Sequence, residues 1–369
     1  MKYDFTVPCL LGVEGLVADE LRYNGFEDVA AENGRVSFIG DMRECARANI
    51  ILRCGERVLL KLASFRADNF EDLFQGVKGI PWEDLTGKEG AFPVKGHSIG
   101  SKLHSVPACQ SIVKKAVAER LKDKFSLSWL EENGPVYQIS FSIMKDIVTV
   151  YLDTSGEPLY KRGYKRENNL ATMRETLAAS LVKIARYKGR ETFIDPFCGS
   201  GTIAIEAAMA ALDIKPGARR NFECEKWGFY NPSVFDELRN EYIAAEKKEA
   251  LPIYSYDLDP ECVKKGMANA ERAGVAGLIT FEQKDALKVE YPEKGTVIAD
   301  PPYGQRMLDI EKARRIYEGL GRRLESRPGL KKYIITSDSE FERHFGIRAD
   351  KKHKLYNGMI KCDLYMYFR

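Results

Sequence analysis

The chain has 369 residues, 44% of them hydrophobic, which is enough for two or three packed units and excludes a single small module. Its 57 Lys and Arg nearly balance its 54 Asp and Glu, so the net charge of +3 argues against binding of nucleic acid through overall charge. No apolar run is long enough to cross a bilayer, and we expect no association with membranes.

The 8 cysteines are scattered and no signal peptide is recognisable, which predicts reduced thiols in the cytoplasm. With 4 His and no ligand-like spacing, we expect no metal site.

The first 155 residues predict a small α+β layer, because short strands are interspersed with helical stretches. The expected strands cover residues 3–7, 35–39, 58–65, 136–143 and 147–152, and the expected helices cover residues 12–23, 41–52 and 108–124. Residues 144–146 are expected to form a hairpin between the last two strands. From about Lys165 the pattern changes to alternating strands and helices, which is typical of an α/β domain.

A glycine-rich turn follows the first strand of this second part. Phe193 and Ile194 end a buried strand, and the turn 195–201, Asp-Pro-Phe-Cys-Gly-Ser-Gly, leads into a strongly helical run. Gly199 and Gly201 remove Cβ atoms where a ligand would lie against the backbone, and the N–H groups of the helix start point at that ligand. Neither a Walker loop nor a full dinucleotide fingerprint is present, which favours a nucleotide-like cofactor without a pyrophosphate.

Three more carboxylates follow predicted strands of the same sheet. These are Asp257 after the strand 253–256, Asp285 after the strand 279–281, and Asp300 after the strand 296–299. Asp257 is placed to accept both hydroxyls of a ribose, and Asp285 can accept an adenine amino group. Because open α/β sheets bind ligands at the carboxyl ends of parallel strands, we expect these carboxylates and Asp195 to line one site.

Several polar segments leave two interpretations open. Basic residues are grouped at Lys161-Arg162 with Lys165-Arg166, at Arg219-Arg220, and at Lys351-Lys352 with Lys354. Each group either contacts phosphates or is a solvated charged face. The segment 215–232, with Trp227 and Tyr230, is either an insertion near a nucleic acid or a surface excursion anchored by two aromatic rings. A Lys/Glu-rich helix over residues 237–249 is expected to be a solvated face.

The turn from Asp195 to Gly201, together with Asp257, resembles the S-adenosylmethionine site of class I methyltransferases. The sequence 300–303, Asp-Pro-Pro-Tyr, resembles the (Asn/Asp)-Pro-Pro-Tyr motif of the amino methyltransferases, which act on adenine N6, cytosine N4 or guanine N2. An exocyclic amine is a poor nucleophile because its lone pair is delocalised into the ring. The resemblance implies that the 300–303 motif holds the two N–H groups of the amine on carboxylate and carbonyl oxygens, while its tyrosine stacks on a flipped base. The two prolines fix φ and keep the carbonyls aimed at the substrate.

The rest of the chain is similar to a THUMP-linked family. Residues 92–98 and the stretch 103–121 resemble a THUMP domain with a leading ferredoxin-like segment, a module of RNA-modifying enzymes. The matching junctions and tail, which resemble those of THUMP-linked guanine-N2 methyltransferases, are residues 153–164, 173–179 and 354–360. The resemblance covers nearly the whole chain and corresponds to the N-terminal half of the bacterial large-subunit ribosomal RNA enzymes.

This resemblance implies a ferredoxin-like segment over residues 1–55, a THUMP RNA-binding domain over residues 56–155 and a Rossmann-like class I methyltransferase domain over residues 165–369. It implies S-adenosylmethionine as cofactor, bound by Arg174, Thr176, Asp195, Phe197, Cys198, Gly199, Ser200, Gly201, Asp257 and Asp285. It implies catalysis by Asp300, Pro301, Pro302 and Tyr303. Cys198 is expected to be a small residue at a tight bend rather than a reactive thiol, because no base is paired with it.

The implied reaction is the formation of N2-methylguanosine, with 23S ribosomal RNA as the first choice of substrate. One departure concerns Asp300, because the ribosomal enzymes usually carry Asn at this position, whereas Asp is usual in a related transfer-RNA branch. Methylation of guanine N2 in transfer RNA therefore stays open. Adenine-N6 methylation and a non-catalytic role as an RNA-binding assembly factor stay open as well.

Overall fold

The computed structural model describes residues 1–166, 173–302 and 310–368. The strands are β1 (Tyr3–Pro8), β2 (Glu27–Glu32), β3 (Arg35–Gly40), β4 (Leu59–Arg66), β5 (Val94–Ile99), β6 (Ile139–Met144), β7 (Ile147–Asp153), β8 (Phe193–Asp195), β9 (Ile253–Asp257), β10 (Ile279–Gln283), β11 (Gly295–Ala299), β12 (Leu330–Thr336), β13 (Lys351–Asn357) and β14 (Ile360–Tyr367). The α-helices are α1 (Glu14–Tyr23), α2 (Met42–Ile51), α3 (Phe70–Lys78), α4 (Val106–Phe125), α5 (Glu175–Ile184), α6 (Thr202–Ala211), α7 (Ser233–Ala244), α8 (Pro260–Arg272), α9 (Ile310–Glu325) and α10 (Phe341–Phe345). The short 3-10 helices are η1 (Trp82–Asp84), η2 (Glu223–Lys226) and η3 (Ala276–Leu278).

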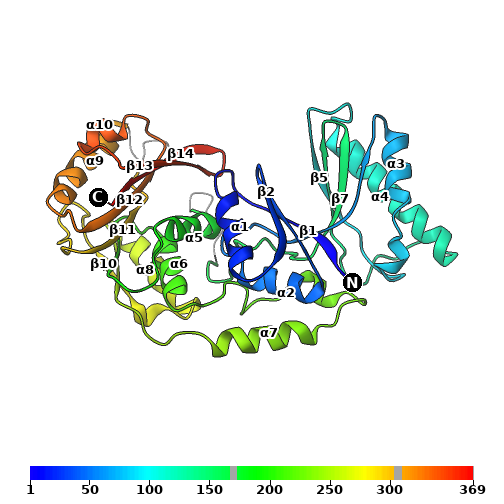
Figure 1. Ribbon diagram of the computed structural model, residues 1–369, viewed down its shortest axis with the longest axis horizontal. Coiled ribbons are helices and arrows are strands. Elements are labelled where there is room, and N and C mark those ends of the chain that lie inside the picture. Colours follow the sequence, from blue (N-terminus) through cyan, green and yellow to red (C-terminus); the bar gives the residue numbers. More distant parts are fainter. Residues whose placement is uncertain (167–172, 303–309, 369) are drawn as a thin grey trace.

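Within the described residues, the strands form two seven-stranded sheets. The N-terminal sheet has the order β2-β3-β1-β4-β7-β6-β5, and the second sheet has the order β10-β9-β8-β11-β12-β14-β13. Figure 1 shows the second sheet at one end of an elongated molecule, β5 and β7 at the other end, and α1 and α2 between them. An α+β part is thus followed by a largely parallel α/β part, which confirms the predicted fold class.

Local sequence signals account for several element boundaries. Asp41 caps α2: its side chain accepts the N–H of Glu44, and the Glu44 carboxylate accepts the N–H of Asp41 at 2.7 Å. Asp259 caps α8 by accepting the backbone N–H of the second helical residue at 2.9 Å. The hairpin between β6 and β7 turns at Lys145 and Asp146, whose positive φ values of 51° and 64° suit a two-residue turn.

The N-terminal sheet runs without interruption across the predicted border at residue 55. β1 pairs antiparallel with both β3 and β4, and β4 pairs antiparallel with β7, so the first two predicted units share one sheet. The border at residue 55 between a ferredoxin-like segment (1–55) and a THUMP domain (56–155) therefore stays a prediction from the sequence.

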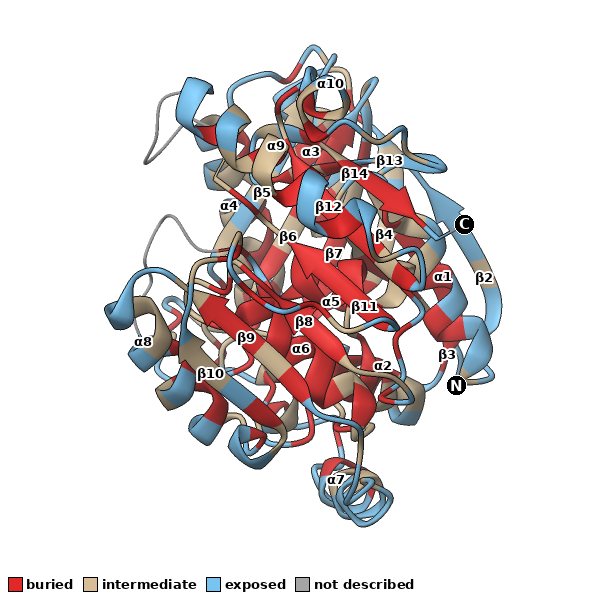
Figure 2. Cartoon of the chain, turned by 90° about the vertical axis from the view of Figure 1, so that its left-hand side faces the viewer, coloured by how far each residue is buried: buried red, intermediate tan, exposed pale blue. Residues whose placement is uncertain are grey.

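The second sheet has a parallel centre. β10, β9, β8, β11 and β12 run parallel, while β14 pairs antiparallel with both β12 and β13. Every residue of β8 and of β11 is buried, and Figure 2 shows both strands inside the molecule. Such continuously buried, mostly apolar strands are typical of a parallel sheet that is covered on both faces.

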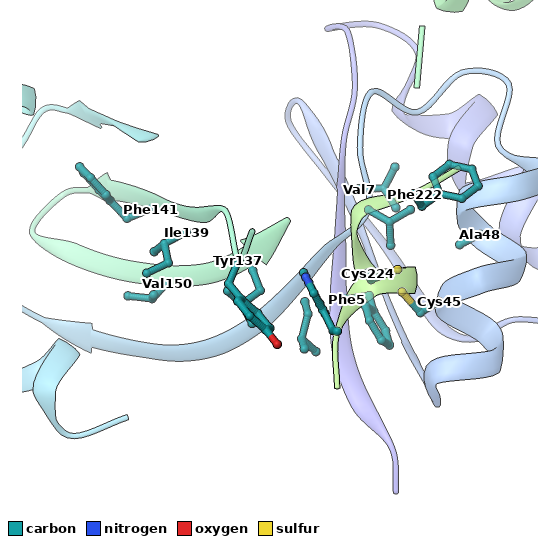
Figure 3. Packing of buried hydrophobic residues seen from close by; sticks show 14 of the residues in the cluster. Phe5, Val7, Cys45, Ala48, Tyr137, Ile139, Phe141, Val150, Phe222 and Cys224 are labelled. Atoms are coloured by element: carbon teal, nitrogen blue, oxygen red, sulfur yellow. The ribbon is translucent and has the colours of Figure 1, made fainter. Parts of the chain in front are cut away.

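The core of the N-terminal part contains side chains from the second part of the chain. Trp227 is buried in the same hydrophobic cluster as residues of β1, and its Nε1 donates to the Val136 carbonyl oxygen at 2.9 Å. Its ring stacks on Tyr137 with centroids 5.3 Å apart. Cys224 of η2 and Cys45 of α2 lie side by side in Figure 3. These contacts connect the segment after α6 directly to the N-terminal sheet and its helices.

This packing decides between the two interpretations of the segment 215–232. Trp227 and Tyr230 are both buried, and the Tyr230 hydroxyl donates to the Met42 carbonyl oxygen at 2.9 Å. Neither ring is available to stack on a nucleic acid. The segment anchors the two parts of the chain to each other, in agreement with the interpretation of the two rings as anchors, although it packs inside a core rather than over the surface.

The charged helix of this region differs from the expected one. α7 begins at Ser233 and ends at Ala244, whereas the charge pattern predicts residues 237–249. Phe235 and Leu238 are buried, and Glu237 Oε2 lies 3.0 Å from Nη1 of Arg43 in the first turn of α2. Figure 1 shows α7 running beneath α2. The charged residues Glu237 and Glu241 are exposed, as expected for a solvated face, while the opposite side of α7 packs against the N-terminal part.

Candidate active site

Asp195, Asp257, Asp285 and Asp300 lie along one edge of the second sheet. Asp195 and Asp257 are the last residues of β8 and β9, Asp285 follows β10, and Asp300 follows β11 directly. These strands are parallel neighbours in the order β10-β9-β8-β11. Their carboxyl ends therefore meet at one edge, where the sequence predicted a ligand site.

The glycine turn between β8 and α6 is held to the neighbouring strand by two hydrogen bonds. Asp257 Oδ2 accepts the N–H of Gly199 at 2.8 Å, and the Tyr256 carbonyl oxygen accepts the N–H of Cys198 at 2.8 Å. Gly199 has a φ of +50°, and a Cβ atom added there would meet no atom within 4 Å. The backbone at Gly199, which is bonded to Asp257, thus borders open space.

Gly201 is required for a different reason. Its φ is +80°, and an added Cβ atom would lie 3.0 Å from the ring of Phe281 and 3.1 Å from the Cα of Gly266. The missing side chain lets the start of α6 approach α8 and β10 closely. We expected the missing side chain of Gly201 to make room for a ligand. The structure gives a different reason, because helix packing occupies that space and only the backbone of Gly201 is available to a ligand.

Asp195 is fully buried at the end of β8. Its Oδ1 accepts the N–H of Phe197 at 3.4 Å, and its Oδ2 has no hydrogen-bond partner among the described residues. Burial raises the pKa of Asp195 well above its usual range, and the negative charges of Asp300 and Asp257 raise it further. These effects favour the protonated form of Asp195, in which the carboxyl group donates as well as accepts a hydrogen bond.

The other predicted residues near the turn have hydrogen bonds and surroundings of their own. The Ser200 carbonyl oxygen accepts the side-chain N–H of Asn269 at 2.9 Å. Asp285 is half-buried, and its Oδ1 accepts the N–H of Leu287 at 2.9 Å. Burial raises the pKa of the Cys198 thiol. The thiol is thus protonated, which agrees with our interpretation of Cys198 as a small residue at a bend.

Asp300, Pro301 and Pro302 continue β11 at the same edge. Pro301 is buried and Pro302 is half-buried. The Pro302 carbonyl oxygen accepts the hydroxyl of Tyr317 at 3.1 Å, and this hydroxyl also lies 3.2 Å from Thr336 Oγ1. Burial raises the pKa of Tyr317 to about 12, so the hydroxyl remains a donor that fixes the second proline. Tyr303, the predicted stacking residue, lies outside the described residues.

Arg174 and Thr176 meet a residue that the sequence did not single out. Arg174 is the N-cap residue of α5, and Thr176 lies in the first turn of this helix. The Thr176 hydroxyl donates to Glu56 Oε1 at 2.6 Å, and Arg174 Nη1 lies 3.4 Å from Glu56 Oε2. Glu56 lies between α2 and β4, far away in the sequence, and no motif marks it.

Several of the grouped basic residues support the fold. Arg162 is buried with its Nε 3.5 Å from Glu206 Oε1, and Arg219 forms a two-pronged ion pair with Glu246. Arg220 donates to three backbone carbonyl oxygens of residues 157–161. Phosphate binding by these arginines is therefore not supported. Among the grouped lysines, Lys161 is paired with Glu157, Lys165 with Glu175 and Lys352 with Glu342. Lys351, Lys352 and Lys354 are all exposed.

Two further properties concern the described part of the chain alone. None of its helices is both long and apolar enough to span a bilayer. Within it, no three or more side chains of His, Cys, Asp and Glu come together in a group that could hold a metal ion.

Protein-family models match the chain in three consecutive stretches. Residues 4–59 match an RlmL ferredoxin-like domain, residues 67–153 match a THUMP domain, and residues 162–366 match an RMKL-like methyltransferase domain. The last match alone covers more than half of the chain and includes all four strand-end carboxylates.

Similar proteins extend the match over the full length. The "Putative RNA methyltransferase YpsC" of Bacillus subtilis is 39% identical over 100% of this chain and 96% of its own length. The "Ribosomal RNA large subunit methyltransferase K/L" of Syntrophotalea carbinolica is 32% identical over 99% of this chain, and the chain spans only 53% of that protein. A crystal structure described as "SMU.472, a putative methyltransferase complexed with SAH" is 36% identical, has a TM-score of 0.95 and covers 100% of this chain and 98% of its own. The chain therefore belongs to the RMKL-like methyltransferase family.

Proposed function

We propose that this protein is an S-adenosylmethionine-dependent RNA methyltransferase that forms N2-methylguanosine in the large-subunit ribosomal RNA. The observation that carries the proposal is the row of four carboxylates at one sheet edge, next to the open turn at Gly199 and the Asp-Pro-Pro sequence after β11. The printed names of the similar proteins support the class of substrate, and the SAH complex of the similar structure supports the cofactor.

The residues at the turn fit this cofactor. The space beside Gly199 admits a ligand against the backbone, and α6 begins there with N–H groups directed toward the site. The two carboxylate oxygens of Asp257 accept the N–H groups of Gly199 and Asp259, and each keeps a further lone pair for a ribose hydroxyl. When bound, S-adenosylmethionine supplies a methyl group on a sulfonium centre. Arg174, Thr176 and Asp285 are proposed to hold its remaining polar groups.

Asp300 and the two prolines would orient the amine that is methylated. The Asp300 carboxylate and the Pro301 carbonyl oxygen would accept its two N–H groups, which shifts electron density onto the nitrogen as the N–CH3 bond forms and the bond from the methyl group to sulfur breaks. The surplus amine proton would then pass to water. The Tyr317 hydroxyl fixes the Pro302 carbonyl oxygen and thereby the path of the backbone after Asp300. Tyr303 is proposed to stack on the flipped base. Catalysis of this kind depends on positioning and electrostatics, without a covalent intermediate.

The experiment that tests this function compares ribosomal and transfer RNA from a deletion strain and its parent by mass spectrometry of nucleosides. We expect N2-methylguanosine to decrease in the large-subunit RNA and to return when the purified protein and S-adenosylmethionine are added. The Asp300→Ala variant serves as the control and should not restore it.

Different outcomes would contradict parts of the proposal. Loss of N2-methylguanosine from transfer RNA alone would reassign the RNA class, and loss of N6-methyladenosine would reassign the base. Binding of S-adenosylmethionine without methylation of any RNA would indicate an assembly factor rather than an enzyme.

A further inference from the structure

Glu56 is fixed in the N-terminal part of the chain. It lies in the loop between α2 and β4, and its backbone N–H donates to the Pro8 carbonyl oxygen at 2.8 Å. Its own carbonyl oxygen accepts the N–H of Leu159 at 2.8 Å. The side chain is only 15% exposed. Because its backbone is held on both sides, Glu56 can direct its carboxylate with little loss of conformational freedom.

This one carboxylate contacts both residues that are proposed to bind the cofactor ahead of the glycine turn. Oε1 accepts the hydroxyl of Thr176, which is fully buried, at 2.6 Å. Oε2 lies 3.4 Å from Nη1 of Arg174, whose guanidinium carbon is 4.9 Å from the centre of the Tyr160 ring. The carboxylate and the ring thus hold the guanidinium from two directions. A guanidinium carries five N–H donors, so others remain for an anionic ligand.

The first turn of α5 is coupled to the glycine turn by packing. Leu177 and Leu181 of α5 share a hydrophobic cluster with Ile203 and Ala204, which lie in the first turn of α6. Because α5 packs directly against α6, we expect a shift at the start of α5 to reach the start of α6. The path from Glu56 to the candidate cofactor site consists of a charged hydrogen bond, one helical turn and a packed helix pair.

We propose that Glu56 is a positioning residue for the cofactor, through which the N-terminal part of the chain orients Arg174 and Thr176. The proposal rests on the proposed function, because it takes these two residues as ligands of S-adenosylmethionine. It assigns the N-terminal part a role in the methyltransferase site in addition to any contact with RNA. Glu56 does not touch the reacting atoms and acts only through its two partners.

The test is calorimetry of S-adenosylmethionine and S-adenosylhomocysteine binding to the full-length protein and its variants. Glu56→Ala removes both contacts, and we expect affinity to fall about tenfold, since hydrogen bonds to charged groups are worth more than neutral ones. Glu56→Gln keeps an acceptor oxygen for the Thr176 hydroxyl and should restore most of the affinity. The matched control is Glu157→Ala. This change also removes a carboxylate that forms an ion pair, here with Lys161, and it should leave cofactor affinity unchanged.

A double-mutant cycle distinguishes positioning from a general loss of stability. If Glu56 acts through Arg174, then Glu56→Ala combined with Arg174→Ala should bind the cofactor about as weakly as Arg174→Ala alone, because coupled residues are not additive. Additive losses, or unchanged affinity in a folded Glu56→Ala protein, would overturn the proposal. If the Arg174→Ala and Thr176→Val variants bind S-adenosylmethionine normally, these two residues are not cofactor ligands. That outcome contradicts the proposed function of the two residues, whereas the outcomes above contradict only the positioning role of Glu56.

Discussion

The fully buried carboxyl group of Asp195 makes folding sensitive to pH. Its pKa is raised in the folded protein, mainly by burial and further by Asp300 and Asp257, so the folded state retains a proton that the unfolded chain releases above about pH 4. The stability contributed by this group is complete below the pKa of the unfolded chain and is lost as the pH rises through the folded pKa. We predict that Asp195→Asn, which mimics the neutral carboxyl group, removes this loss.

The measurement is urea unfolding of the wild type and the variant between pH 4.5 and 8. The free energy of unfolding of the variant should rise relative to the wild type with increasing pH, by at most about 1.4 kcal/mol per pH unit for one proton. The exposed Asp19→Asn is the control and should give a curve parallel to the wild type. Parallel curves for Asp195→Asn would show that Asp195 is ionised in the folded protein.

Asp300 provides a test of how the amine is activated. Asp300→Ala removes the acceptor oxygen, and we predict a loss of about a hundredfold or more in turnover with little change in cofactor affinity. Asp300→Asn keeps an acceptor oxygen and should retain substantial activity, because the proposed role is hydrogen-bond acceptance and not proton removal. Single-turnover rates on the native RNA decide between these roles. Equally severe losses in both variants would identify Asp300 as a general base.

At the level of elements, the two glycines of the turn should respond differently to the same substitution. Both have positive φ, so Gly199→Ala and Gly201→Ala each cost about 1–2 kcal/mol of backbone strain. Only at Gly201 would the new Cβ atom also press on Phe281 and on the Cα of Gly266. We predict that Gly201→Ala lowers the free energy of unfolding further, while Gly199→Ala mainly weakens cofactor binding.

Thermal unfolding and calorimetry with S-adenosylhomocysteine measure these two effects on the same proteins. Each variant is the control for the other, because backbone strain is common to both. If Gly199→Ala binds the cofactor normally, the open space beside it is not where the ligand lies. If both variants are equally destabilised, the close approach of α6 to α8 has no energetic importance.

The carboxylates could be predicted at the sheet edge because their positions follow from local signals. A short apolar run followed by an acidic residue recurs at Asp195, Asp257 and Asp300, and a parallel sheet places such positions together. Glu56 and Tyr317 could not be predicted in this way. Tyr317 lies on the buried side of α9, where a tyrosine resembles any core residue, and its hydroxyl reaches Pro302 only through the tertiary fold.

Helices and strands, too, could be predicted only where local sequence determines them. α2 and the β6–β7 hairpin can be predicted because caps and turns are encoded within a few residues. The charge pattern places α7 too late in the chain, since its charged residues suggest solvent while Phe235 and Leu238 pack on a partner that is distant in the sequence. Tertiary contacts override local charge patterns at such positions.

At the scale of the whole molecule, the two parts of the chain share a core. Trp227, Phe222 and Phe235 follow α6 of the second sheet, yet they belong to the hydrophobic cluster of the N-terminal part. A fragment beginning near residue 165 would expose these rings to water. Removal of the N-terminal part is therefore an unsuitable test of where RNA binds, and substitutions in the full chain are required.

The shared core predicts how the protein unfolds when the connection is weakened. Trp227 is 1% exposed, stacks on Tyr137 and donates a hydrogen bond to the Val136 carbonyl oxygen. Trp227→Ala removes all of these contacts, and we predict a loss of roughly 3–5 kcal/mol in the free energy of unfolding. Because the lost contacts join the two parts, differential scanning calorimetry should resolve two transitions in the variant. S-adenosylhomocysteine should raise only the transition of the methyltransferase part, since a ligand stabilises the unit that binds it.

The matched control for this prediction is Phe229→Ala. The Phe229 ring packs against Trp227 with centroids 5.6 Å apart but is 36% exposed and belongs to the same segment. Its removal should shift the unfolding temperature only slightly and leave a single transition, because the buried ring and its hydrogen bond remain. A single transition in Trp227→Ala that the ligand raises as a whole would show that the two parts stay coupled without this residue. In that case the contacts of Arg162, Glu206 and Glu56 across the same junction would be sufficient to hold them together.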